Sequence, residues 1–98
     1  MTNSYCNNMH TIQTKRLVQT FISMVRIDSE SGNEAMFADF MMKTGAALGA
    51  RTRKDDYGNV YIEIAGTGEP IMLNTHMDTV SPGVGIEPRI KGEYVTSY

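Results

Sequence analysis

Hydrophobic and polar residues first alternate with a clear period between about Thr14 and Val25. The apolar positions recur at steps of three and four residues, which is the spacing of one helical face. They are Leu17, Val18, Phe21, Ile22 and Val25. Polar and charged residues fall on the opposite side, and the pattern breaks in the stretch 28–32. The sequence therefore predicts a first helix over about 14–25.

A second helix is predicted over about 33–48. Ser31 and Glu34 have the S-x-x-E spacing of a capping box. In this motif the serine hydroxyl accepts a hydrogen bond from a free helix amide, and the glutamate reaches back to the serine amide. The apolar face expected for this helix consists of Met36, Phe37, Phe40, Met41 and Leu48. Methionine fills irregular gaps in cores, so these methionines are interpreted as core residues and not as ligands.

The period changes after Gly49, and strands are predicted in place of helices. A short strand is expected over 50–54, followed by a turn rich in Asp, Gly and Asn over 55–59. The alternating, β-branched stretch 60–64 predicts a second strand. Ile71–Leu73 is a compact apolar run, typical of a strand that is covered on both faces. Two helices followed by strands predict an α/β fold with the helices packed on a mixed β-sheet.

Composition and charge narrow the class of protein. The 98 residues suit one small domain, and 41% hydrophobic with 20% charged residues is typical of a soluble globular protein. The formal net charge is −2 and no basic run is present, which argues against nucleic acid as a partner. No apolar run reaches the roughly 18 residues that span a bilayer, and the polar start of the chain lacks the features of a secretory signal. Cys6 is the single cysteine, so an internal disulfide is excluded and the cytoplasm is the expected location.

His76 and Asp78 carry the candidate chemistry of the chain. They are two residues apart, so on an extended backbone both side chains point to one side, with Met77 opposite. A metal-binding imidazole commonly donates its other N–H to a carboxylate, and this pair has the residue types for that arrangement. By spacing alone, however, such a pair more often serves ordinary polar packing, because a catalytic zinc needs at least three protein ligands. His10, the other histidine, lies in the polar first stretch of the chain.

Two further groups of polar residues favour structural roles. Asp28, Ser29 and Ser31 lie between the predicted helices, where turn-forming and helix-capping roles are favoured over catalysis. Asp55 and Asp56 resemble a pair of catalytic carboxylates. Their position beside Tyr-Gly-Asn favours a tight turn between strands instead.

Three stretches together resemble a known family, namely Val25–Glu34, Asp56–Val60 and Asn74–Gly83. In the same order and spacing they are similar to the start of the zinc exopeptidases related to peptidase T, whose family includes glutamate carboxypeptidase and aminoacylase. The run H-M-D-T-V followed by S-P-G is more specific to the peptidase T-like branch than a His and an Asp alone. The resemblance covers roughly residues 13–98, and residues 1–12 are interpreted as a polar N-terminal tail.

The resemblance implies a division of labour in the catalytic site. In such enzymes the histidine matching His76 binds one of two zinc ions, and the aspartate matching Asp78 orients that histidine. The two metals share a water or hydroxide, polarise the scissile carbonyl and generate the nucleophile, while a glutamate acts as general base. The base and the remaining ligands come later in the family than the positions that this chain matches. His76 is therefore the one metal ligand expected here.

We therefore expect residues 13–98 to be the incomplete, truncated N-terminal part of a zinc exopeptidase catalytic domain. The complete enzyme is expected to hydrolyse terminal peptide bonds of small peptides and to act without nucleic acid or membrane partners. Self-association into a homo-oligomer stays open, and the chain alone is expected to be inactive.

The alternative is a non-enzymatic fragment that associates with another copy or with a separate chain. Unpaired backbone groups at an open sheet edge invite such pairing. A structural zinc module is disfavoured, because it needs four ligands and the chain has one cysteine and two histidines.

Overall fold

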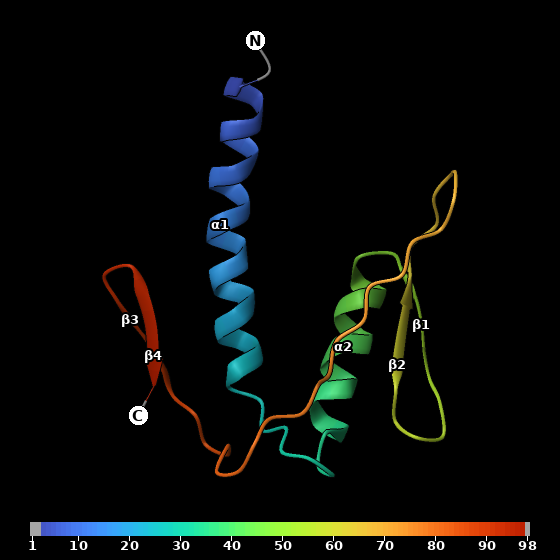
Figure 1. The fold of residues 1–98 in the computed structure, drawn as a ribbon, viewed down its shortest axis with the longest axis vertical. Helices are drawn as coiled ribbons and strands as arrows, with labels where there is room; N and C mark the ends of the chain where they lie inside the picture. The colour runs from blue at the N-terminus through green and yellow to red at the C-terminus, as the bar shows by residue number, and fades with distance from the viewer. Residues whose placement is uncertain (1–2, 98) are drawn as a thin grey trace. The chain divides into compact units, whose positions relative to one another are not determined.

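A computed structural model describes the backbone of residues 3–97 and the side chains of residues 13–97. The side chains of Cys6 and His10 therefore lie outside the described residues. The chain divides into two compact units, one made of the residues before Asp28 and after Val84, and the other made of Asp28–Val84. Figure 1 shows the elements of each unit along the chain, and each unit is described by itself.

The first unit contains the long helix α1, Asn3–Val25. The predicted helix is confirmed, and it extends through most of the stretch that the sequence assigns to a polar tail. On the predicted apolar face, Ile22 is buried, whereas Leu17 and Phe21 stay largely exposed. This face is therefore only partly covered within the described residues.

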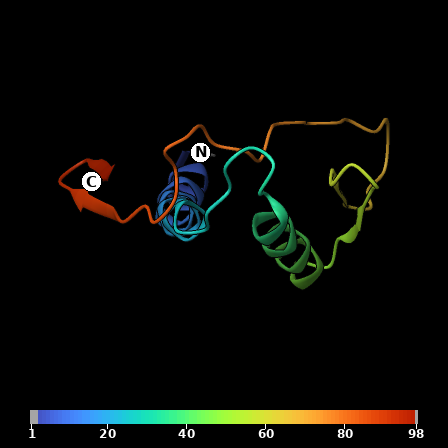
Figure 2. The same ribbon diagram turned by 90° about the horizontal axis from the view of Figure 1, so that it is seen from below.

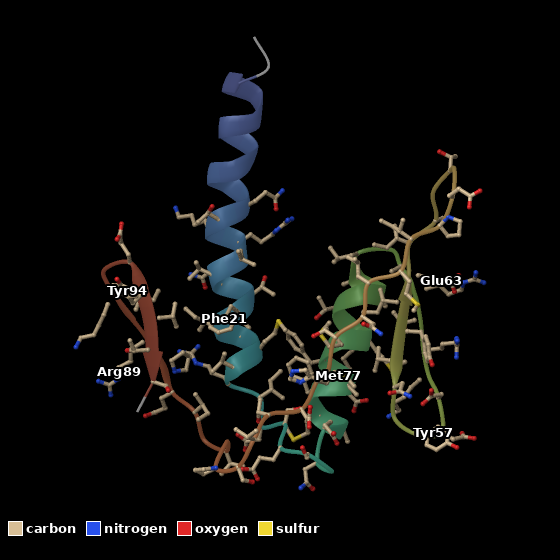
Figure 3. All side chains as sticks on the ribbon, in the orientation of Figure 1. Phe21, Tyr57, Glu63, Met77, Arg89 and Tyr94 are labelled. Carbon is tan, nitrogen blue, oxygen red and sulfur yellow. The ribbon has the colours of Figure 1, made fainter. Side chains whose placement is uncertain are left out.

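The first unit also contains a C-terminal hairpin. Strand β3, Pro88–Lys91, pairs antiparallel with β4, Tyr94–Ser97, through a two-residue turn. Figure 3 shows the side chains of Arg89 on β3 and Tyr94 on β4. Residues after the S-P-G break thus form a regular element, where the sequence shows only weak patterning.

The second unit is a helix packed on a hairpin. Helix α2, Ala35–Ala47, contacts both β1, Arg51–Lys54, and β2, Val60–Glu63. The two strands pair antiparallel, with Thr52 opposite Ile62. These elements confirm the predicted second helix and the first two predicted strands, with slightly shorter bounds.

Gly45 lets α2 approach the hairpin closely. A Cβ atom at this position would lie 3.0 Å from Cγ2 of Thr52 and 3.2 Å from Cγ2 of Ile62. Phe37 and Ala38 are buried on the same helix, and Phe37, Met41 and Gly45 follow one another at intervals of four residues along one face. The helix therefore packs through its smallest residue, and the sequence pattern of large apolar residues did not indicate that contact.

The predicted capping box is wrong. The N-cap residue of α2 is Glu34, and it makes no side-chain capping hydrogen bond. The Ser31 hydroxyl donates instead to the carboxylate of Asp78. Spacing alone suggested the box, but a partner distant in sequence takes the serine hydroxyl.

The prediction that Ile71–Leu73 forms a covered strand is also wrong. The three side chains are 88%, 82% and 91% exposed, and the backbone forms no strand there. Figure 2 shows this part of the chain as an extended line after β2. A strand with two apolar faces gains its stability from layers on both sides, and no described element supplies them.

The predicted α/β class is confirmed. The described strands form two separate antiparallel pairs, and the one parallel pairing is an isolated bridge between Glu30 and Thr79. Neither described helix is long and apolar enough to cross a lipid bilayer.

Candidate functional site

Residues 28–34, the loop that precedes α2, form hydrogen bonds to the segment that contains His76 and Asp78. The amide of Thr79 donates to the carbonyl of Ser29 at 2.8 Å, which forms the parallel bridge. The Ser29 hydroxyl donates to the carbonyl of Met77 at 2.8 Å. The Glu30 carboxylate accepts from the amide of Gly83 at 2.6 Å. These three contacts attach the loop to Met77, Thr79 and Gly83, on both sides of Asp78.

Two residues make this attachment tight. Ser29 is only 2% exposed, so the hydrogen bond of its hydroxyl is shielded from water. At Gly83 an added Cβ would lie 2.7 Å from the carbonyl oxygen of Val80 and 2.8 Å from Oγ1 of Thr79. Any side chain at this position would therefore force the turn after Thr79 to move.

His76 and Asp78 are in direct contact. Nδ1 of His76 lies 2.9 Å from the carbonyl oxygen of Asp78 and 3.0 Å from its Oδ1. Both are acceptors, so the geometry assigns the ring proton to Nδ1 and leaves the lone pair on Nε2. The His76 side chain is 81% exposed. It therefore presents an open imidazole nitrogen of the kind that binds a metal.

Met77 faces the other way. It is half-buried and lines a small hollow together with Ala35 and Ala38 of α2. Figure 3 shows its side chain near the lower end of that helix. The alternation expected from the sequence is thus present, with the apolar residue turned inward and its two polar neighbours outward.

Ser31 completes the group around Asp78. Its hydroxyl donates to Oδ2 of Asp78 at 2.5 Å, while Oδ1 faces His76. The hydrogen bond from Ser31, followed by the charge and the hydrogen bond of His76, holds the pKa of Asp78 below its usual value. Asp78 is therefore a carboxylate at neutral pH, as the orientation of a histidine requires.

The structure brings together the two site residues that the sequence singles out and adds Ser31, to which the sequence assigns a turn or cap. Ser31 lies 47 residues before its partner. Local spacing carries no signal for such a contact, and the similarity of both stretches to one family was the only available hint.

Asp55 has the turn role that the sequence favours. Its Oδ1 accepts from the amides of Tyr57 and Asn59 at 3.0 and 2.9 Å. Its Oδ2 accepts from the Asn59 side chain at 3.0 Å and from the Tyr61 hydroxyl at 3.1 Å. Tyr57 marks the tip of this turn in Figure 3. All donors come from the same hairpin, so Asp55 closes a turn and is not part of a pair of catalytic carboxylates.

The described residues do not form a complete metal centre. No group of three or more His, Cys, Asp or Glu side chains among them is arranged to hold a metal ion. A zinc site takes three or four protein ligands. His76, with Nδ1 held by a carboxylate and Nε2 open, fits one of those positions.

Comparison with known proteins gives the context of this site. No protein-family model matches the chain. The crystal structure of aminopeptidase PepT from Bacillus cereus superposes with a TM-score of 0.76 and is 34% identical, over 85% of this chain and 25% of that chain. The chain is related to peptidase T-like peptidases.

Curated sequences agree with this relationship. The protein YqjE of Bacillus subtilis is 33% identical over 94 residues, or 86% of this chain and 25% of that protein. A putative LysW-lysine/LysW-ornithine hydrolase of Pyrococcus furiosus is 38% identical over 72 residues, or 74% and 22% of the two chains. A probable carboxypeptidase of Talaromyces marneffei is 32% identical over 85 residues, or 74% and 19%. The chain thus spans about a quarter or less of the length of each of these proteins.

Proposed function

We propose that the chain is part of a peptidase T-like zinc exopeptidase that hydrolyses terminal peptide bonds of small peptides in the cytoplasm. The likeness to an aminopeptidase in both sequence and structure supports the reaction class. The hydrolase and the carboxypeptidase among the related sequences agree with it. The observation that carries the proposal is the His76–Asp78 contact in the segment whose sequence resembles the family.

In this proposal His76 is a zinc ligand through Nε2. The carboxylate of Asp78 lies 3.0 Å from Nδ1 and its carbonyl oxygen 2.9 Å, and together these acceptors fix the tautomer that leaves Nε2 unprotonated. Asp78 thus acts through His76 and is a positioning residue of the catalytic site. In the complete enzyme His76 would hold one of two zinc ions, and such a pair would supply polarisation of the scissile carbonyl and a lower pKa for bound water.

The chain alone is inactive in this proposal. A single histidine cannot hold the two zinc ions that the family resemblance implies, and the described residues offer no further ligand cluster. The general base of the family also has no counterpart among the residues of this chain that resemble the family.

The test combines an activity assay with a binding assay on the purified 98-residue chain. We expect no hydrolysis of tripeptides with added zinc. We expect Zn²⁺ to shift the Nε2 signal of His76 in ¹⁵N spectra, and a His10→Gln variant assigns the signals. The His76→Ala variant should lose this response. A chelator-sensitive hydrolysis that His76→Ala abolishes would overturn the inactivity of the chain, and an Nε2 signal indifferent to zinc would overturn the ligand role.

A second candidate function is association through exposed chain, without catalysis. Ile71, Met72 and Leu73 are each more than 80% exposed and follow one another along an extended backbone. Such a stretch can add a strand to another copy or to a separate chain. Size-exclusion chromatography with metal analysis separates the two candidates. A stable dimer that Met72→Lys dissociates would favour association, and a monomer would count against it.

A further inference from the structure

We propose that Ser31 is a positioning residue for His76 and acts through the carboxylate of Asp78. The inference rests on the proposed role of His76 as a metal ligand and deepens it. In this arrangement the Ser31 hydroxyl fixes the rotation of the Asp78 side chain. The fixed carboxylate, together with the carbonyl oxygen of the same residue, in turn holds the proton of His76 on Nδ1, so that Nε2 faces outward with its lone pair.

The two oxygens of Asp78 are divided between two partners. Oδ2 accepts from the Ser31 hydroxyl at 2.5 Å, and Oδ1 faces Nδ1 of His76 at 3.0 Å. A carboxylate held at one oxygen only can rotate about its side-chain torsions, and Asp78 is 37% exposed, so packing alone does not prevent that motion. The hydroxyl of Ser31 supplies the second point of attachment.

Ser31 is itself held in place by its neighbours. Ser29 contacts the backbone at Met77 and Thr79, the residues directly before and after Asp78. Glu30 contacts the backbone at Gly83. The register between the two segments is therefore set by three bonds that do not involve the Ser31 hydroxyl. Removing that hydroxyl should free Asp78 and leave the segments attached.

A capping role does not account for Ser31. Helix α2 begins at Ala35, and its N-cap residue Glu34 makes no side-chain capping bond. The Ser31 hydroxyl has one described partner, and this partner is the carboxylate in contact with the candidate ligand. The Ser31 hydroxyl therefore acts on the Asp78–His76 pair and does not cap the helix.

The experiment measures the tautomer of His76 in the metal-free 98-residue chain by ¹⁵N spectroscopy. At about pH 9 histidine side chains are ordinarily neutral, so each ring carries its proton on one nitrogen. We expect the Nδ1–H form to dominate in the unaltered chain. In Ser31→Ala the ratio of Nδ1–H to Nε2–H should fall about fivefold, the factor for losing one hydrogen bond of ordinary net strength. Ser31→Thr, which keeps the hydroxyl, should restore the ratio, and Ser81→Ala is the matched control in the same segment.

The amide signals of Thr79 and Gly83 show whether the segments stay attached. If Ser31→Ala leaves both signals in place and lowers the ratio, the inference holds. An unchanged ratio in Ser31→Ala overturns it. If the amide signals also move, Ser31→Thr decides, because recovery of the ratio supports the inference and failure to recover contradicts it. Adding Zn²⁺ to the same samples tests the ligand role separately, since an Nε2 signal indifferent to zinc would contradict the proposed function and leave the tautomer result intact.

Discussion

The second unit contains two hydrogen-bonded aspartates with different roles, Asp55 and Asp78. Both accept several hydrogen bonds, and both have a pKa below the usual value. For Asp55 the side chain of Asn59 is the first cause, and every partner lies within six residues in the same hairpin. For Asp78 the first cause is Ser31, which lies 47 residues earlier in the chain.

The difference separates a structural carboxylate from a candidate functional one. The hydrogen bonds of the Asp55 carboxylate all come from its own hairpin, and they hold no other side chain in a position to bind a ligand. Those of Asp78 join a distant loop to an exposed imidazole, whose second nitrogen stays open. A low pKa is common to both residues, so the pKa alone does not mark a site. What distinguishes the two aspartates is whether their hydrogen bonds connect to a side chain that can bind a ligand.

The largest expected effect comes from disrupting the turn at Gly83, whose amide bonds to the Glu30 carboxylate. In Gly83→Val the new side chain would meet the carbonyl of Val80 and the side chain of Thr79. We expect this variant to lose about 3 kcal/mol of stability, the upper range for overpacking, and to lose the His76–Asp78 contact. Urea unfolding and ¹⁵N spectra measure the two effects. Gly66→Val, where nothing lies within 4 Å, is the control, and equal effects in both variants would contradict the prediction.

A smaller effect is expected from Ser29→Ala. This change removes the hydroxyl that donates to the Met77 carbonyl and leaves a shielded acceptor without its partner. We expect a loss of about 1–2 kcal/mol in the free energy of unfolding, within the range for an unsatisfied buried group. Urea unfolding followed by circular dichroism gives the value. Ser81→Ala, which alters an exposed serine, should change little, and a neutral Ser29→Ala would show that the loop attachment does not depend on this hydroxyl.

The comparison also explains how much the sequence could predict. Local sequence patterns located α2, β1 and β2, because each pattern lies within or directly beside the element that it predicts. Asp55 could be assigned to a turn for the same reason, since its donors are the neighbouring Tyr57 and Asn59. Family likeness pointed to His76 and Asp78, whose contact spans only two residues.

Contacts between distant stretches were not predictable in this way. Ser31 fits a local capping motif, and the motif prediction was wrong because Asp78 offers its hydroxyl a charged acceptor. Ile71–Leu73 carries the pattern of a covered strand, yet a pattern cannot say which layers are present to cover it. Both errors come from reading a tertiary interaction as a local one.

The pH dependence of the turn tests the structural role of Asp55. Its folded pKa lies below the usual 3.8, so the hydrogen bonds of the turn are fully present above the unfolded pKa and are lost as the pH falls through the folded value. We expect the Asn59 amide signal to follow this transition, because its N–H donates to the Asp55 carboxylate. Asp55→Asn should remove the transition, and Asp56→Asn should keep it. A transition that survives in Asp55→Asn would assign it to another group.

The smallest effect is expected from Arg53→Gln. The guanidinium carbon of Arg53 lies 3.8 Å from the centre of the Tyr61 ring, and the Tyr61 hydroxyl donates to Asp55. Removing this exposed cation–π contact should cost about 0.5 kcal/mol, measured by urea unfolding, and Arg53→Lys should retain part of it. Because the network of Asp55 ends within its hairpin, the ring signals of Tyr61 should move while those of His76 stay fixed. A shift at His76 would show that the two carboxylates are coupled after all.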